Sequence, residues 1–262
     1  MDKKNNQMLL RIIIAFVVWC LTYKGVSLLC DKVSFNMSEG ISYIVNIIVK
    51  CTIPLVLVYP VLRGLPTSQS GTPVTKPTVL YITKMFLIQS GFSVMALTLV
   101  TIIIRIFNIN AEQSRDDTAE MIKQYPLVMM VVLLIFTPIV NEILFRMLFF
   151  DRLVVLGTKK AVVISALFYS FPFLLFKGPT LFAYSFVIGL SLGYVRARTK
   201  RLWPCIILNT LDNLYYRFLL AFLYPLDKPI SMMIFVFVYI LAVPIIAIVL
   251  AVVNRRKFII SP

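Results

Sequence analysis

Two ionisable residues, Glu142 and Arg146, stand alone in a long apolar stretch that runs from Leu127 to Phe150. Residues four apart share one face of a helix, and an acid on the N-terminal side of a base is the favourable order. Inside a hydrocarbon layer such groups are costly, so they usually face the interior of a bundle and have a partner. This pair is therefore the first candidate for a catalytic or binding site.

A polar stripe lies within a later apolar segment and consists of Asn209, Asp212, Asn213 and Tyr216. The two asparagines are four apart and share a helix face, and Asp212 lies beside that face. We expect this stripe to meet the Glu142–Arg146 pair inside the bundle. Such a group serves either as a ligand or catalytic site or as a structural tie, at about 1 kcal/mol per interhelical hydrogen bond.

The composition indicates which elements must position these residues. Of the 262 residues, 60% are hydrophobic, and the mean hydropathy is +0.92, which exceeds that of soluble domains. Apolar runs long enough to cross a bilayer recur along the chain. We predict an all-α, polytopic membrane bundle of about eight transmembrane helices. Their approximate bounds are 8–29, 41–62, 79–104, 126–150, 160–176, 180–195, 203–223 and 230–253.

The net charge of +15 comes mostly from Lys and Arg in the short segments between the predicted spans. Alternate segments carry most of these residues, and Lys and Arg favour the cytoplasmic side. Both termini are therefore predicted to be cytoplasmic. Topology and anionic lipid account for the basic charge, so we expect membrane lipid as a partner and no nucleic acid.

The sequence contains no histidine, so histidine general acid–base chemistry and the commonest metal ligand are excluded. The four cysteines have no paired spacing that would indicate a disulfide framework or a zinc site. We expect neither a cofactor nor a metal. Gly189 and Gly193 form a G-x-x-x-G pattern, which permits close helix packing, either within the bundle or, as the less favoured alternative, at a dimer face.

The stretch Thr137–Arg146 closely resembles the first motif of the CPBP family of intramembrane glutamic proteases, also called the Abi or CAAX-protease family. That motif has two adjacent glutamates, three further residues and an arginine. The segment Ala161–Pro172 is similar to the family's Phe-x-x-x-His helix, and Gly189–Asn213 is similar to the stretch that ends in His-x-x-x-Asn. The three motifs follow in the family's order over about 126–223.

The sequence departs from these motifs at the positions where the family has an ionisable glutamate or histidine. Four motif residues are retained: Glu142, Arg146, Phe168 and Asn213. Asn141 replaces the first glutamate, and Pro172 and Asn209 replace the two histidines. An asparagine cannot accept a proton as a general base, and a proline side chain offers neither a donor nor an acceptor.

In the family, the glutamate and histidines are taken to activate water for peptide hydrolysis, and the asparagine to stabilise the oxyanion. By this resemblance Glu142, Arg146 and Asn213 occupy catalytic positions, and Phe168 and Asp212 are candidates to line the cavity. Because of the substitutions we interpret the chain as a catalytically degenerate member, a pseudoenzyme that binds a protein or peptide partner as a scaffold or regulator. The family's bacterial associations imply bacteriocin immunity or envelope-protein regulation, and a multi-pass protein of the bacterial cell membrane.

Two alternatives remain open. The first is an active CAAX-type intramembrane endopeptidase that uses Glu142, with help from Asp212. The second is a small-molecule or lipid transporter in which Lys50 and Lys84 line a path for an anion. For the domain organisation we expect three N-terminal helices with polar loops over 1–125, the CPBP-like core over 126–223, and a last helix with a basic tail over 224–262.

Overall fold

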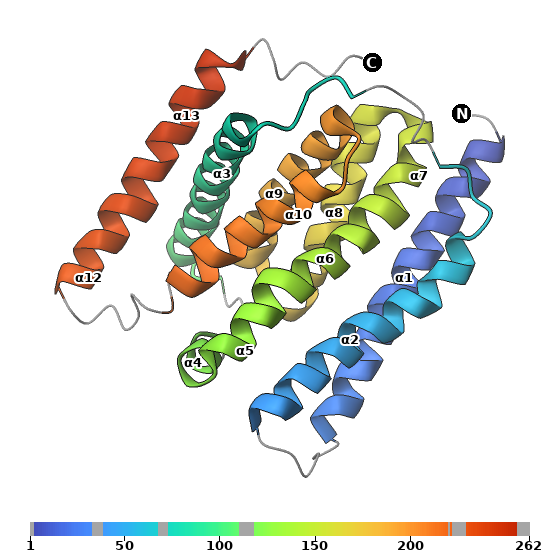
Figure 1. The fold of residues 1–262 in the computed structure, drawn as a ribbon, viewed down its shortest axis with the longest axis horizontal. Helices are drawn as coiled ribbons and strands as arrows, with labels where there is room; N and C mark the ends of the chain where they lie inside the picture. Colours follow the sequence, from blue (N-terminus) through green and yellow to red (C-terminus); the bar gives the residue numbers. More distant parts are fainter. Residues whose placement is uncertain are drawn as a thin grey trace.

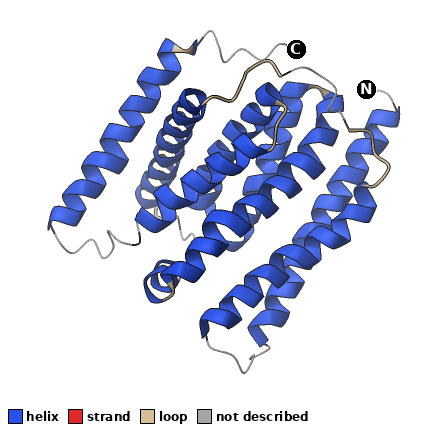
Figure 2. Cartoon of the chain, viewed as in Figure 1, coloured by secondary structure: helices blue, strands red, loops and turns tan. Residues whose placement is uncertain are grey.

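The computed structural model describes residues 3–32, 39–67, 73–109, 118–219, 221 and 229–255. All regular structure within these ranges is helical, and none of the described residues forms a strand (Figure 2). The prediction of an all-α membrane bundle is therefore confirmed.

Five long helices are regular over their whole length: α1 (Lys3–Lys32), α2 (Glu39–Leu62), α3 (Val79–Ile106), α8 (Thr158–Phe176) and α9 (Pro179–Thr199). Three others contain π-helical turns. The first runs through α5 (Pro126–Met130), η1 (Val131–Phe136), α6 (Thr137–Glu142), η2 (Ile143–Phe150) and α7 (Asp151–Leu153), and ends in the 3₁₀ turn η3 (Val154–Leu156). The second joins α10 (Trp203–Asp212) to η4 (Asn213–Leu219), and the third joins α12 (Pro229–Ile234), η5 (Phe235–Ala242) and α13 (Val243–Val253). The short helix α4 (Thr118–Gln124) precedes α5.

Seven of the described helical stretches are long and apolar enough to cross a membrane. They correspond to seven of the eight predicted spans, so the chain is a multi-pass membrane protein. The remaining prediction, 203–223, corresponds to the α10–η4 helix, which is continuous over 203–219. Residues 220, 222 and 223 of that prediction lie outside the described residues.

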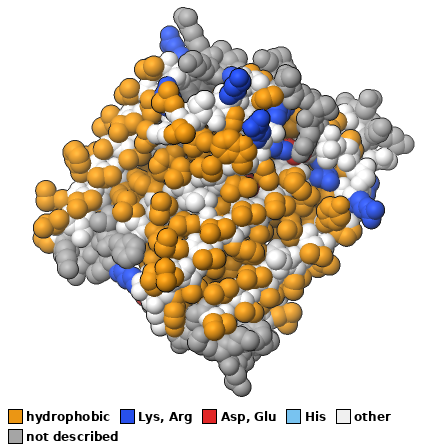
Figure 3. Space-filling model, viewed as in Figure 1, with side chains coloured by type: hydrophobic (Ala, Val, Ile, Leu, Met, Phe, Trp, Pro, Cys, Tyr) orange, Lys and Arg blue, Asp and Glu red, His pale blue; other side chains and the backbone are white. Residues whose placement is uncertain are grey.

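The helices form a slab in which α6, α8, α9 and α10 occupy the middle (Figure 1). The α1–α2 hairpin lies on one side, and α3 with the α12–α13 helix lies on the other (Figure 1). Helix α1 begins and α13 ends at the same edge of the bundle (Figure 1), as an even number of crossings requires. That this edge is cytoplasmic remains a prediction. One face of the slab is broadly hydrophobic, and Lys and Arg gather mainly towards this edge (Figure 3).

Helices α8 and α9 pack closely because α9 carries glycines where they meet. A Cβ added at Gly189 would lie 2.8 Å from the Ala166 Cα, and one at Gly193 would lie 3.4 Å from the Val162 Cα. The G-x-x-x-G pattern is thus used for packing inside the bundle, which was the favoured interpretation. The close approach also brings the Gly189 carbonyl within reach of side chains from other helices.

The last turn of α2 is fastened to the rest of the bundle by two arginines. Arg11 donates a hydrogen bond to the Val61 carbonyl at 3.2 Å, and Arg152 donates to the Leu62 carbonyl, also at 3.2 Å. A helix end leaves its last carbonyls without partners inside the helix. These two contacts supply such partners from α1 and α7.

Candidate functional site

Glu142 ends α6 and Arg146 lies one turn later in η2, and both side chains are 0% exposed. The Arg146 Nε lies 3.4 Å from the Glu142 Oε2. The predicted pair on one helix face is therefore present, although a π-helical turn separates the two residues. An unpaired charge here would be very costly, so the two groups stabilise each other.

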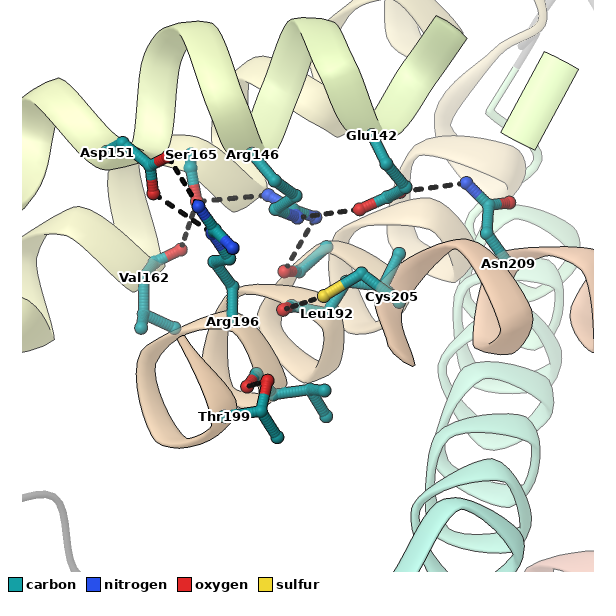
Figure 4. A network of polar contacts seen from close by, with 12 residues as sticks. Glu142, Arg146, Asp151, Val162, Ser165, Leu192, Arg196, Thr199, Cys205 and Asn209 are labelled. Atoms are coloured by element: carbon teal, nitrogen blue, oxygen red, sulfur yellow. Dashed lines mark hydrogen bonds and ion pairs between the residues drawn. The ribbon is translucent and has the colours of Figure 1, made fainter. Parts of the chain in front are cut away.

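The rest of the Arg146 guanidinium contacts two other helices. Its Nη1 donates to the Ser165 Oγ on α8 at 3.1 Å, and its Nη2 donates to the Gly189 carbonyl on α9 at 3.1 Å (Figure 4). Its Cζ also lies 5.5 Å from the centre of the Tyr169 ring, within the range of a cation–π contact. Arg146 thus joins η2 to both helices of the close-packed α8–α9 pair.

Asn209 completes the surroundings of the carboxylate. Its Nδ2 donates to the Glu142 Oε1 at 2.9 Å, and its side chain is buried on α10 (Figure 4). The Glu142 Oε1 therefore accepts a hydrogen bond from Asn209, whereas its Oε2 is in an ion pair with Arg146 and accepts no hydrogen bond within the described part of the chain. We call Glu142, Arg146, Ser165, Gly189 and Asn209 the Glu142 network.

Asn213 does not join this network. Its Nδ2 donates to the Leu133 carbonyl at 2.9 Å, and neighbouring Thr210 donates to the Leu134 carbonyl at 2.8 Å. These carbonyls lie four and five residues before Pro138, which has no main-chain N–H to donate. In a membrane such freed carbonyls need a partner within the protein. Asn213 and Thr210 therefore tie η4 and α10 to η1.

Asp212 faces a third direction. Its Oδ1 accepts a hydrogen bond from the Tyr184 hydroxyl on α9 at 2.9 Å, and the Tyr216 ring lies 4.4 Å from the Tyr184 ring. The residues of the polar stripe therefore contact different helices, and Asn209 is the one that is bonded to Glu142. Asp212 is bonded to a tyrosine on α9 and makes no contact with Glu142.

The remaining motif positions lie on α6 and α8. Pro172 is buried within α8, three residues beyond Tyr169 and on the same face as Ser165. Phe168 packs against other aromatic rings instead. Its ring is stacked on Phe16 of α1, with centroids 4.2 Å apart. Phe168 is therefore a packing residue between α8 and α1. Asn141 is half-buried at the end of α6, next to Glu142.

A second buried ion pair joins Asp151 and Arg196, which lie just beyond the ends of the predicted spans 126–150 and 180–195. The Arg196 Nε and Nη2 donate to the two Asp151 carboxylate oxygens at 3.0 and 2.6 Å, and both residues are buried (Figure 4). Helix α9 continues to Thr199, and the first helix of the core continues through Asp151 into α7. The pairing offsets the desolvation cost of burying these two charges.

The lysines proposed for an anion path lie on separate parts of the bundle. Lys50 is half-buried on α2, and Lys84 is half-buried on α3. Helix α2 packs mainly against α1, whereas α3 packs against α9 and α13 (Figure 1). The structure does not bring the two lysines together.

The chemistry of the Glu142 network follows from its burial and its donors. Neither Glu142 nor Arg146 has any surface open to a water-sized probe, so a hydrolytic water has no place beside the carboxylate in this conformation. Asn209 offers an amide donor where a histidine would exchange protons. Among the described residues, no group of three or more His, Cys, Asp or Glu is placed to hold a metal ion.

Three members of this arrangement were not singled out from the sequence: Ser165, Thr210 and Tyr184. Ser and Thr are common in membrane helices, where their hydroxyls usually bond to their own backbone. Ser165 does this as well, donating to the Val162 carbonyl at 3.2 Å while it receives Arg146. For Thr210, the signal that could have identified it was Pro138, which frees carbonyls that a nearby helix must satisfy.

Comparison with known proteins gives one result for the core. Residues 123–215 match the family described as type II CAAX prenyl endopeptidase Rce1-like. Neither the curated proteins nor the solved structures contain a match to the chain. The matched segment contains α5 to α10 and both ends of the Glu142–Asn209 contact.

Proposed function

We propose that the chain, whose residues 123–215 match the Rce1-like family, is a catalytically inactive member that binds a membrane partner without cleaving it. The observation that carries this proposal is the hydrogen bond from the Asn209 amide to Glu142. At this position in the family's motif a histidine would take up and release protons. The amide donates but does not titrate.

The other groups at the site support the same conclusion. Arg146 contributes hydrogen-bond donors only, and Pro172 contributes no side-chain donor or acceptor. Asn141 replaces the neighbouring glutamate and cannot act as a base. Glu142 is thus the only carboxylate of the network. Its Oε1 accepts a hydrogen bond from Asn209, and its Oε2 lies in an ion pair with Arg146. General acid–base catalysis needs a second, positioned group that this network lacks.

In this proposal the Glu142 network serves as a structural tie. It connects α6 and η2 to α8 through Ser165, to α9 through Gly189 and to α10 through Asn209. The network ties these helices together with an asparagine amide at position 209. A rigid bundle of this kind suits a scaffold, since the surface it presents to a partner is preorganised.

The partner is a protein or peptide in or at the membrane. Bacteriocin immunity and envelope-protein regulation in a bacterial cytoplasmic membrane are the contexts that the family resemblance implies. The absence of peptide cleavage and the binding of a partner can be tested on the same purified protein.

The test compares wild type with Glu142→Gln, which keeps the size of the side chain and its ability to accept Asn209. Both proteins are purified in mild detergent. Each is incubated with a prenylated CAAX-type peptide and, separately, used as bait to capture partners from solubilised membranes. Mass spectrometry then reads partners and peptide fragments together. We expect intact peptides with both proteins and the same captured partner. Cleavage by wild type that Glu142→Gln abolishes, at an unchanged melting temperature, would contradict the proposal.

A further inference from the structure

A group of basic side chains lies where the end of α9 meets the start of α3, and the Glu142 network does not use it. We call this group the basic cluster, and it consists of Lys76, Arg198, Lys200 and Arg201. The main chain brings its two parts together, since the Val74 and Thr75 N–H groups donate to the Arg198 carbonyl at 3.0 and 3.2 Å. The extended segment that leads into α3 is therefore fixed against the last turn of α9.

The turn after α9 is held in place by Arg196. Its Nη1 donates to the Lys200 carbonyl at 3.0 Å, while its Nε and Nη2 bind the Asp151 carboxylate (Figure 4). The Arg201 N–H donates to the Thr199 hydroxyl at 3.4 Å. Asp151 is thus already paired, and within the described part of the chain no carboxylate forms an ion pair with a member of the basic cluster. The cluster is therefore a positive surface on an ordered main chain.

Arg198 is the member of the cluster that is partly removed from water. Its side chain is half-buried near Tyr81 and Tyr194. Its Nε is enclosed and has no hydrogen-bond partner among the described residues, whereas its two Nη nitrogens are not enclosed. A desolvated charge without a counter-charge is costly. An anion bound at the Nη nitrogens would offset that cost, and a guanidinium suits the oxygens of a phosphate or carboxylate.

The neighbours of the cluster indicate the depth at which it lies. Trp203 begins α10 two residues after the cluster and is 39% exposed, and tryptophan is enriched at the level of the lipid headgroups. Val79 and Leu80 begin α3 and are 82% and 63% exposed. The cluster lies at the edge where Lys and Arg gather (Figure 3). Exposed apolar side chains beside it favour a ligand with acyl chains over a soluble anion.

We propose that the basic cluster binds the phosphate of an anionic phospholipid. Arg198 donates to the phosphate from its Nη nitrogens, and the acyl chains lie along the exposed apolar residues at the start of α3. Phosphatidylcholine also has a phosphate, but its choline cation is repelled by Lys76, Lys200 and Arg201. The site therefore selects a headgroup with a net negative charge. This inference does not depend on whether the Glu142 network is catalytic.

The experiment uses Trp203 as a reporter of the lipid beside it. The sequence contains two tryptophans, so Trp19→Phe leaves Trp203 as the single fluorophore. The full-length protein is reconstituted into vesicles of equimolar phosphatidylglycerol and phosphatidylcholine. One lipid at a time carries bromine atoms near the headgroup end of its acyl chains, and bromine quenches a nearby tryptophan. We expect phosphatidylglycerol to be preferred beside Trp203 by about fivefold or more.

Three variants in this background separate a built site from diffuse surface charge. Arg198→Gln should lower the preference by about fivefold. Arg198→Lys keeps the charge but not the forked donors, so it should lower the preference in part. The matched control is Arg255→Gln, which removes one exposed charge beyond α13 at the same edge and should change the preference by less than about twofold. Equal quenching by the two lipids in the parent protein, or equal losses in Arg198→Gln and Arg255→Gln, would overturn the inference.

Melting temperature gives a second readout. Phosphatidylglycerol should raise the melting temperature of the parent protein more than that of Arg198→Gln. In phosphatidylcholine alone the two should melt together, because the Arg198 carbonyl and not its side chain holds the segment before α3. A large fall there would overturn the inference, since Arg198 would then serve helix packing. Loss of the lipid preference on adding glycerol phosphate at matched ionic strength would overturn it as well, because the cluster would then bind a free phosphate.

Discussion

The Asn209 amide reaches the Glu142 carboxylate across 2.9 Å from a helix 67 residues further along the chain. This contact joins the first and last motifs of the Rce1-like segment and secures α10 against α6. A histidine at position 209 would offer a ring nitrogen to the same oxygen. The asparagine amide donates this hydrogen bond but, unlike a histidine, does not titrate.

Removing the Asn209 amide should destabilise the protein, because Glu142 would lose a hydrogen bond in an apolar interior. We expect Asn209→Ala to lower the free energy of unfolding by about 1–3 kcal/mol. Reversible unfolding in mixed detergent micelles measures this loss. Ile207→Ala on the same helix is the control, since Ile207 is half out of the bundle and 39% exposed. An equal loss in both variants would show that the hydrogen bond contributes little.

The Glu142–Arg146 pair should behave as a coupled unit. Arg146→Met leaves a buried carboxylate without its counter-charge and should cost about 3–5 kcal/mol. The double variant Glu142→Gln with Arg146→Met removes both charges and should recover a large part of that loss. A double-mutant cycle on the free energy of unfolding measures the coupling. Additive effects would indicate that the two groups are not paired in the membrane.

Glycine substitutions in α9 should be graded by the space beside each residue. Gly189→Ala places a methyl group 2.8 Å from the Ala166 Cα and also displaces the carbonyl that receives Arg146. We expect a loss of at least 1–3 kcal/mol, as for other overpacked sites. Gly193→Ala should cost less, because its nearest contacts lie at 3.4 Å. Gly25→Ala in α1 has open space and is the neutral control. Melting temperatures in the reverse order would contradict this packing.

Thr210 and Pro138 should be energetically linked. Thr210→Val removes the donor to the Leu134 carbonyl and should cost about 1–2 kcal/mol in a bilayer. Pro138→Ala restores a main-chain N–H in the same region, so it should lessen the effect of Thr210→Val when the two are combined. The free energies of unfolding of the two single variants and the double variant test this. Thr210→Ser keeps the hydroxyl and should stay near wild type. If Pro138→Ala did not alter the cost of Thr210→Val, the freed carbonyl would not be the reason for the contact.

The parts of the fold that depend on local spacing and hydropathy were predictable. Seven of the predicted spans are present as membrane-length helices, and the Glu142–Arg146 pairing follows from their separation of four residues. Asn209 was correctly placed near Glu142 because the polar stripe had to face the interior. Asp212 does not lie near Glu142 as the stripe predicted. It is three residues from Asn209, so its side chain points about 60° away around the helix axis. That rotation directs it to Tyr184 on α9.

The parts that depend on which helices are neighbours were not predictable from spacing. Ser165 and the Gly189 carbonyl become partners of Arg146 only because α8 and α9 pack closely beside η2. Asp151 and Arg196 fall just outside the predicted spans 126–150 and 180–195. They are buried because their opposite charges pair, although 45 residues of sequence separate them. No local sequence pattern indicates such a pairing.

The hydrogen bond from Arg152 to the Leu62 carbonyl spans 90 residues, and it has a consequence for how the protein is made. Chains are synthesised from the N-terminus at about 5–20 residues per second, so the α1–α2 hairpin emerges several seconds before Arg152 exists. Until then the Leu62 carbonyl lacks this donor. The edge of the bundle where α2 ends is therefore completed late, and premature termination before Arg152 would leave the Arg11 contact with Val61 in place without the contact to Leu62.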